Sequence, residues 1–105
     1  MSFKWPSKDK DELLDYSVDW SRYLAGNTIT SVVWSVDNES GVKTVFSPAT
    51  TVNGLQNVSQ TISGDVATIN LNLGTNNAEY KIYCTMTDNR NSIAERVVRL
   101  KIKEQ

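Results

Sequence analysis

Apolar and polar residues alternate with a period of two over several short stretches of the chain, as they do in half-buried β-strands. In residues 15–20, Tyr16, Val18 and Trp20 fall on one face, and acidic and hydroxyl side chains fall on the other. Residues 79–87 show the clearest alternation. Strands are therefore expected at residues 15–20, 28–36, 42–46, 56–63, 66–73, 79–87 and 92–103.

Turn signals separate these stretches. Gly64-Asp65 is expected to close a hairpin, and Asn53-Gly54 marks a tight turn between short extended pieces. Short strands with frequent turns and little helix are typical of a sandwich. We predict an all-β fold, an antiparallel immunoglobulin-like β-sandwich of about seven to eight short strands. The aromatic residues expected in its core are Tyr16, Trp20, Trp34 and Tyr80.

Residues 1–12 are expected to form an extended N-terminal arm, and residues 13–105 the sandwich domain. Pro6 interrupts regular structure, and the alternating Lys and Asp residues after it are strongly solvated. Phe3 and Trp5 indicate that the arm docks on a surface, because aromatic side chains on a polar tail need one. We expect this surface to belong to its own domain rather than to a neighbouring protein.

The segment at residues 8–20 reads KDKDELLDYSVDW. Its carboxylates could hold Ca²⁺, but the glycine and distal glutamate of an EF-hand loop are missing and lysines would repel a cation. The favoured interpretation is a solvated arm that leads into the exposed side of the first strand. A helix over residues 9–24 is the alternative, and a helical turn at residues 9–14 would reconcile both patterns. The carboxylates are Asp9, Asp11, Glu12, Asp15 and Asp19.

Composition narrows the function classes. A chain of 105 residues fits one domain, and a net charge of -1 argues against nucleic-acid binding through bulk charge. No apolar run approaches the roughly 18 residues that span a membrane, and no secretory signal is expected. Cys84 is the one cysteine, which excludes an internal disulfide and favours synthesis in a reducing cytoplasm.

Candidate catalytic chemistry is sparse. The chain has no histidine, which removes the commonest general base and metal ligand. Cys84 falls on an apolar strand face, where a structural thiol is expected rather than a nucleophile. A pair of carboxylates for glycoside hydrolysis would need a deep cleft, and a sandwich of this size offers little room for one. We therefore expect no catalytic residues, no metal and no cofactor.

Surface features suggest contacts with other proteins. Tyr23 and Tyr83 fall on polar faces, where they are expected to be exposed and suit either a protein or a carbohydrate partner. The last predicted strand carries a basic stripe that is expected on its outer side, where it would protect an edge strand from pairing. The stripe consists of Arg96, Arg99, Lys101 and Lys103.

The string KDKDELLDYSVDWS at residues 8–21 is followed by Leu24, by Asn27-Thr28-Ile29 and by a tryptophan-containing strand that ends at Val36. This order resembles a family of small structural proteins of tailed phages and prophages. In that family a KDPD-like segment precedes an LDY-x-[IV]-DWS strand, a GDTI turn and an S-x-W-x-V strand. Lys10 stands here where proline is usual, and Asn replaces Asp in the turn.

The resemblance implies a non-enzymatic immunoglobulin-like module of the virion, made in the host cytoplasm. We expect it to bind the capsid exterior as a decoration or head-fibre protein, with the major capsid protein or another virion protein as partner. A component of the head–tail junction or tail, or a carbohydrate-binding module that contacts the host, is the alternative. A homo-oligomer, such as a trimer, fits this role. The residues expected to contact the partner are Phe3, Trp5, Lys8, Lys10, Tyr23 and Tyr83.

Overall fold

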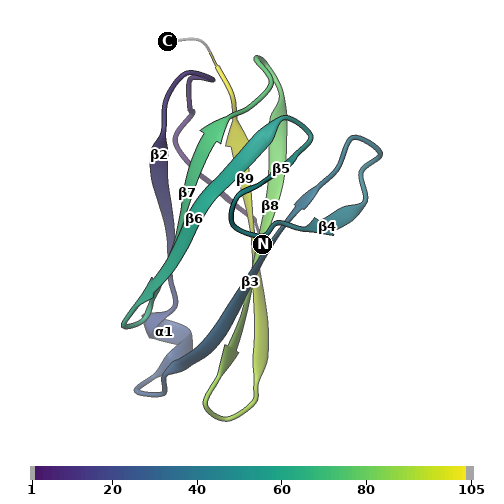
Figure 1. Cartoon of the computed structure of the whole chain (residues 1–105). Helices are drawn as coiled ribbons and strands as arrows, with labels where there is room; N and C mark the ends of the chain where they lie inside the picture. Colours follow the sequence, from purple (N-terminus) through teal and green to yellow (C-terminus); the bar gives the residue numbers. More distant parts are fainter. Residues whose placement is uncertain (1, 104–105) are drawn as a thin grey trace.

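The computed structural model describes residues 2–103, with the side chains of Ser2 and Phe3 outside the described part. The chain forms two β-sheets that pack face to face, so the predicted all-β sandwich is confirmed (Figure 1). One short helix, α1 (Ser21–Leu24), follows the second strand. The strands are β1 (Ser2–Lys4), β2 (Leu14–Asp19), β3 (Ile29–Asp37), β4 (Lys43–Val45), β5 (Thr50–Val52), β6 (Leu55–Ser63), β7 (Val66–Leu73), β8 (Glu79–Asp88) and β9 (Ile93–Lys101).

The first sheet has the order β1-β9-β8-β3-β4, and the second has the order β2-β7-β6-β5. All neighbouring strands are antiparallel except β1, which runs parallel to β9. The strands β1 and β5 have three residues each, which is too short for an alternating pattern to reveal them. The hairpin at Gly64-Asp65 joins β6 to β7 as predicted.

The inner faces of the two sheets enclose one apolar core. The four aromatic residues predicted for it are all buried, with Tyr16 the most exposed at 6%. Cys84 lies in the same core, and burial raises the pKa of its thiol to about 12. The other fully covered members are mainly aliphatic residues of β7, β8 and β9, including Ala67, Ile69, Leu71, Ile82, Met86, Val98 and Leu100.

The N-terminal segment packs on its own domain, as the sequence favoured. The backbone N–H of Trp5 donates to the carbonyl of Arg99 at 2.9 Å, which continues the pairing of β1 with β9. The Trp5 ring stacks on Tyr16 at 4.7 Å between centroids and lies 6.1 Å from the Trp34 ring. The segment is thus part of the folded domain. The domain boundary after residue 12 stays a prediction.

Lys8 has no exposed surface, which is unusual for a lysine. Its ammonium donates to the carbonyl of Leu73 at 2.8 Å and to the carbonyl of Asp9 at 2.7 Å. Its backbone N–H donates to Lys101, and its carbonyl accepts from Lys103. Burial lowers the pKa of Lys8, against the opposing field of nearby carboxylates. Residues 5–8 therefore close one end of the sandwich.

The helical content is small. Residues 9–12 form a hydrogen-bonded turn in which the N–H of Glu12 donates to the carbonyl of Asp9. The alternative of a helix over residues 9–24 is wrong, whereas a single turn before the strand agrees with the reconciling interpretation, although it is shorter than residues 9–14. Leu14 instead begins β2, because the alternating pattern lets Tyr16 and Val18 reach the core. No helix within residues 2–103 is long and apolar enough to cross a membrane.

Raising the pH above about 10.5 is expected to destabilise this fold. Burial raises the pKa of both Tyr16 and Tyr83 to about 12 from an ordinary value of 10.0. Above pH 10 the unfolded chain releases these protons while the folded chain keeps them, so stability is lost as the pH rises towards 12. The lowered pKa of Lys8 makes the fold more stable as the pH rises, but only at pH values below 10.5, the ordinary pKa of lysine in the unfolded chain. Urea unfolding midpoints should therefore fall between pH 10.5 and 12, and a constant midpoint would contradict this assignment.

Candidate functional site

Among the residues expected to contact a partner, Trp5 and Lys8 of the N-terminal segment instead contact other residues of the same domain. Trp5 is half-buried against the core, and Lys8 is fully buried. Lys10 is exposed and forms an ion pair with Asp11 at 3.6 Å. The side chain of Phe3 lies outside the described part. A partner can therefore reach Lys10 directly, whereas the ammonium of Lys8 is inaccessible because it caps backbone carbonyls.

Tyr83 lies on the outer face of the first sheet, but it is only 9% exposed, so the expected exposure is wrong. Its hydroxyl donates to Asp37 at 2.7 Å. The ammonium groups of Lys43 and Lys81 lie over its ring, 4.9 Å and 5.4 Å from the centroid. Neighbouring charged side chains thus cover this aromatic ring, which leaves little of it for a partner.

Tyr23 is half-buried in a cluster of aromatic and arginine side chains beside α1. Its ring meets Trp20 edge-on at 5.9 Å, with the guanidinium groups of Arg90 and Arg96 at 5.8 Å and 5.9 Å. Arg96 pairs opposite the buried Cys84, so it lies on the inner side of β9 and not on the outer stripe that the sequence predicted. It covers the Trp20 ring at 4.7 Å, a cation–π contact that shields the indole.

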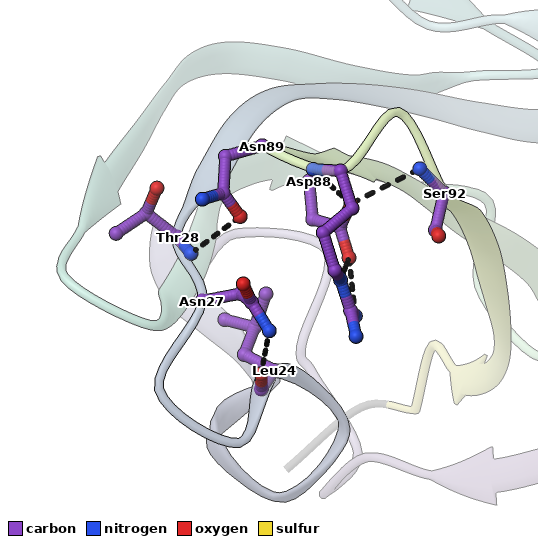
Figure 2. A network of polar contacts seen from close by, with 7 residues as sticks. Leu24, Asn27, Thr28, Asp88, Asn89 and Ser92 are labelled. Atoms are coloured by element: carbon purple, nitrogen blue, oxygen red, sulfur yellow. Dashed lines mark hydrogen bonds and ion pairs between the residues drawn. The ribbon is translucent and has the colours of Figure 1, made fainter.

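The loops at this end of the sandwich hold one another in place (Figure 2). The buried carboxylate of Asp88 accepts hydrogen bonds from the backbone of Arg90 and Ser92 and from the Arg90 guanidinium. Hydrogen bonds from the Arg90 side chain are the largest cause that lowers the pKa of Asp88. Asn89 accepts from the backbone N–H of Thr28 at 3.2 Å, which joins the β8–β9 loop to the start of β3. These polar groups are used to build the loops.

The N-terminal carboxylates serve local structure. Asp9 accepts from the N–H of Asp11, and Glu12 accepts from the N–H of Asp9, so these residues close their own turn. Asp15 accepts from the side chain of Asn70 across the second sheet. Asp19 accepts from the N–H of Ser21 before α1, which lowers the pKa of Asp19. Within residues 2–103, no group of three or more acidic, cysteine or histidine side chains could hold a metal ion.

One side of the sandwich exposes two bare strand edges. The short strand β4 pairs with residues 35–37 of β3, and β5 pairs with residues 55–57 of β6. Beyond these pairs, residues 29–33 and residues 58–63 have no neighbouring strand on that side within the described chain (Figure 1). The uncharged edge, as we define it, comprises these two segments and the exposed side chains Val33, Val45, Val58 and Ile62.

Two shallow grooves show that the two bare segments lie side by side. The first, of about 150 Å³, is lined by β3 and β6 residues that include Val32, Gln60 and Ile62. The second, of about 140 Å³, continues from Val32 and Val33 along β4 to Pro48. Val32 faces the gap between the sheets, and Val33, at 46% exposed, faces outward. A partner at this edge would therefore meet apolar side chains and open backbone groups together.

Charge is absent from the two bare segments, residues 29–33 and 58–63. Residues 28–36 contain no charged side chain, and Asp65 is the one charged residue in residues 44–78. Edge strands are usually protected by lysines or other charges, and the centres of protein interfaces are depleted in charge. The opposite side, where β2 and β1 form the edges, carries Lys4, Asp15 and Asp19. The uncharged edge is thus the part of the surface best suited to dock another protein.

The sequence interpretation missed this edge. Periodicity locates β3 and β6 but does not say which neighbours are too short to cover them. The signal that could have found it is the scarcity of charge from Thr44 to Ala78, where Asp65 is the one charged residue, in a chain where charges are otherwise frequent. The exposed large apolar side chains of the described chain are all aliphatic, which favours a protein partner over a stacked sugar ring.

Comparison with known protein families gives a match that covers most of the chain. A family model described as podophage GP4 fiber-tail adaptor protein gp77 matches residues 8–101, nearly the whole described domain. No match is found among the curated proteins. The matched residues include both bare segments of the uncharged edge and the string that carried the resemblance to phage structural proteins.

Proposed function

Because the chain belongs to the gp77 family of podophage fiber-tail adaptor proteins, we propose that it is a non-enzymatic structural adaptor that resides in the tail of a phage particle. The uncharged edge is the surface through which it assembles into that tail. The observation that carries this proposal is the pair of bare, charge-free strand edges on one side of the sandwich. The family description supports a position in the tail over a position on the capsid exterior. Binding to the capsid exterior stays a prediction.

The proposed mechanism is adhesion of a preformed surface. Both bare segments belong to strands that pair on their other side with β8 and β7, so their backbones are already extended. A partner strand or apolar surface can dock without first ordering the adaptor, which lowers the entropic cost of binding. The buried thiol of Cys84, with a pKa of about 12, is protonated at neutral pH and supports a role without catalysis.

Replacing an exposed apolar residue of the uncharged edge by lysine is expected to weaken binding to phage particles at least tenfold. Val33→Lys and Ile62→Lys each place a charge where a partner would have to bury it, and an uncompensated charge easily costs the roughly 1.4 kcal/mol that corresponds to this factor. The measurement is co-sedimentation of the purified protein with particles that lack it, at increasing protein concentration.

Ile93→Lys is the matched control, because Ile93 is 68% exposed and lies at the start of β9, which β8 separates from the bare β3 segment. It makes the same chemical change and should leave binding intact. Circular dichroism should show that all three variants are folded. Equal binding by wild type and both edge variants would overturn the proposed role of the uncharged edge.

A further inference from the structure

We propose that a second copy of this chain docks on the uncharged edge, with residues 59–63 of β6 paired in antiparallel orientation to the same residues of the copy. The second sheet would then continue from one molecule into the other across a two-fold axis. This inference rests on the proposed function and divides the uncharged edge: the second copy occupies its β6 part, and the bare β3 segment with Val33 remains for the tail.

The backbone of residues 59–63 is suited to strand addition. These five residues pair in unbroken register with β7, from Ser59 opposite Asn70 to Ser63 opposite Val66. The register shift of β6 lies before Ser59 and therefore outside this segment. In β3 a similar shift falls between Ile29 and Ser31, so that bare edge offers a shorter regular stretch. The β6 segment is the longer regular template for another strand.

The register of such a pair follows from symmetry. Directly opposite residues of an antiparallel pair point to the same face, so the two-fold axis must pass through a residue and not between two residues. An axis at Thr61 pairs all five residues, with Ser59 opposite Ser63, Gln60 opposite Ile62 and Thr61 opposite itself. In β6, every second residue points its backbone N–H and C=O groups away from β7. In this register, these groups lie opposite the same groups of the copy.

The side chains are compatible with themselves in this register. On the outer face, Thr61 lies opposite Thr68, and Thr68 lies opposite Ser17 with 2.8 Å between their hydroxyl oxygens. The copy would extend this hydroxyl row through a Thr61–Thr61 pair, a favourable cross-strand combination. On the inner face, Ile62 of each molecule would lie opposite Gln60 of the copy and diagonal to Ile62 of the copy. The pairing would cover the Ile62 side chain, which is 46% exposed.

Charge explains why this edge, and not the opposite one, would self-associate. Residues 59–63 carry no charge, so two copies meet without like-charge repulsion. The edge strand β2 at the other end of the second sheet carries Asp15 and Asp19, which would approach their own equivalents in a self-pair. Association through β6 alone is isologous and closes at a dimer, instead of continuing as a filament.

Sedimentation velocity of the full chain over a wide concentration range tests the proposal. We expect reversible dimers for the wild type and for the matched control Ile93→Lys. Ile62→Lys should dimerise at least tenfold more weakly, because two lysines would meet near the axis. A wild-type chain that is monomeric at all concentrations, or an Ile62→Lys variant that dimerises as well as wild type, would overturn the proposal.

A cysteine cross-link tests the register independently of the strength of association. Thr61→Cys should form an intermolecular disulfide or a short bismaleimide cross-link, because the axis places the two residues opposite each other. Ser17→Cys, on β2 of the same sheet, is the control that should not react, and Cys84 is buried in both variants. Equal cross-linking of the two variants would contradict the register.

These outcomes separate the inference from the proposed function. If the protein is monomeric while Val33→Lys and Ile62→Lys still lose binding to particles, the second copy is the wrong partner and the uncharged edge remains the docking surface. If the protein dimerises as proposed while both variants bind particles normally, the adaptor uses another surface to assemble into the tail.

Discussion

Removal of residues 1–10 should lower the free energy of unfolding by about 3 to 5 kcal/mol, because it removes a half-buried tryptophan together with a paired strand and the buried contacts of Lys8. The truncation removes β1, whose backbone pairs with β9, and the Trp5 ring that stacks on Tyr16 and approaches Trp34. These two core aromatics would then face solvent at the open side of the sandwich. The N-terminal segment is thus a structural part of the domain.

Urea or thermal denaturation of a chain that starts at Asp11 measures this effect. Trp5→Ala in the full chain should reproduce much of the loss, because the Trp5 ring packs against the core. Lys10→Ala is the control within the same segment, since its side chain is exposed and should leave stability within about 0.5 kcal/mol. A truncated chain as stable as the full chain would contradict the packing described for Trp5.

Gly74→Ala should lower the free energy of unfolding by about 2 to 4 kcal/mol, from backbone strain together with overpacking. Gly74 has φ of +114°, a conformation that L side chains rarely adopt. A Cβ there would lie 2.8 Å from both Cδ1 and Cγ1 of Ile102, which is fully buried. The neighbouring carbonyl of Leu73 also accepts from the Lys8 ammonium, so a backbone shift at this position would disturb that contact.

Gly26→Ala is the matched control for the steric part of this effect. Gly26 has φ of +94°, but a Cβ there meets nothing within 4 Å. Its substitution should therefore cost only the conformational strain, and urea denaturation of both variants should separate the two contributions. If both substitutions cost the same, the close approach of Gly74 to Ile102 does not contribute to stability.

The alternating pattern predicts most of the fold because each long strand has one face in the core. This is why β2, β7 and β8 appear in the sequence close to their observed bounds. The one-turn helix α1 and the strand β1 leave no such pattern, since three or four residues cannot show a period. Their positions depend on contacts with distant parts of the chain, as in the pairing of β1 with the last strand.

The candidate site was less accessible to sequence reasoning for a different physical reason. Exposure depends on which neighbours cover a side chain, and Tyr83 is covered by lysines from two other positions along the chain. Trp5 and Lys8 are residue types that often contact partner proteins, but here they contact other residues of the same domain. The uncharged edge arises from the shortness of β4 and β5, a property of the topology that no local pattern encodes.

Complementation in vivo tests whether the uncharged edge joins this adaptor to the phage tail. Phage that lack the gene would be grown in cells that supply wild type, a Val33→Lys and Ile62→Lys double variant, or Ile93→Lys, and the adaptor and tail fibres per purified particle would be counted by quantitative mass spectrometry. We expect particles that lack both adaptor and fibres for the double variant, and normal particles for Ile93→Lys. A full number of adaptors and fibres with the double variant would contradict this expectation.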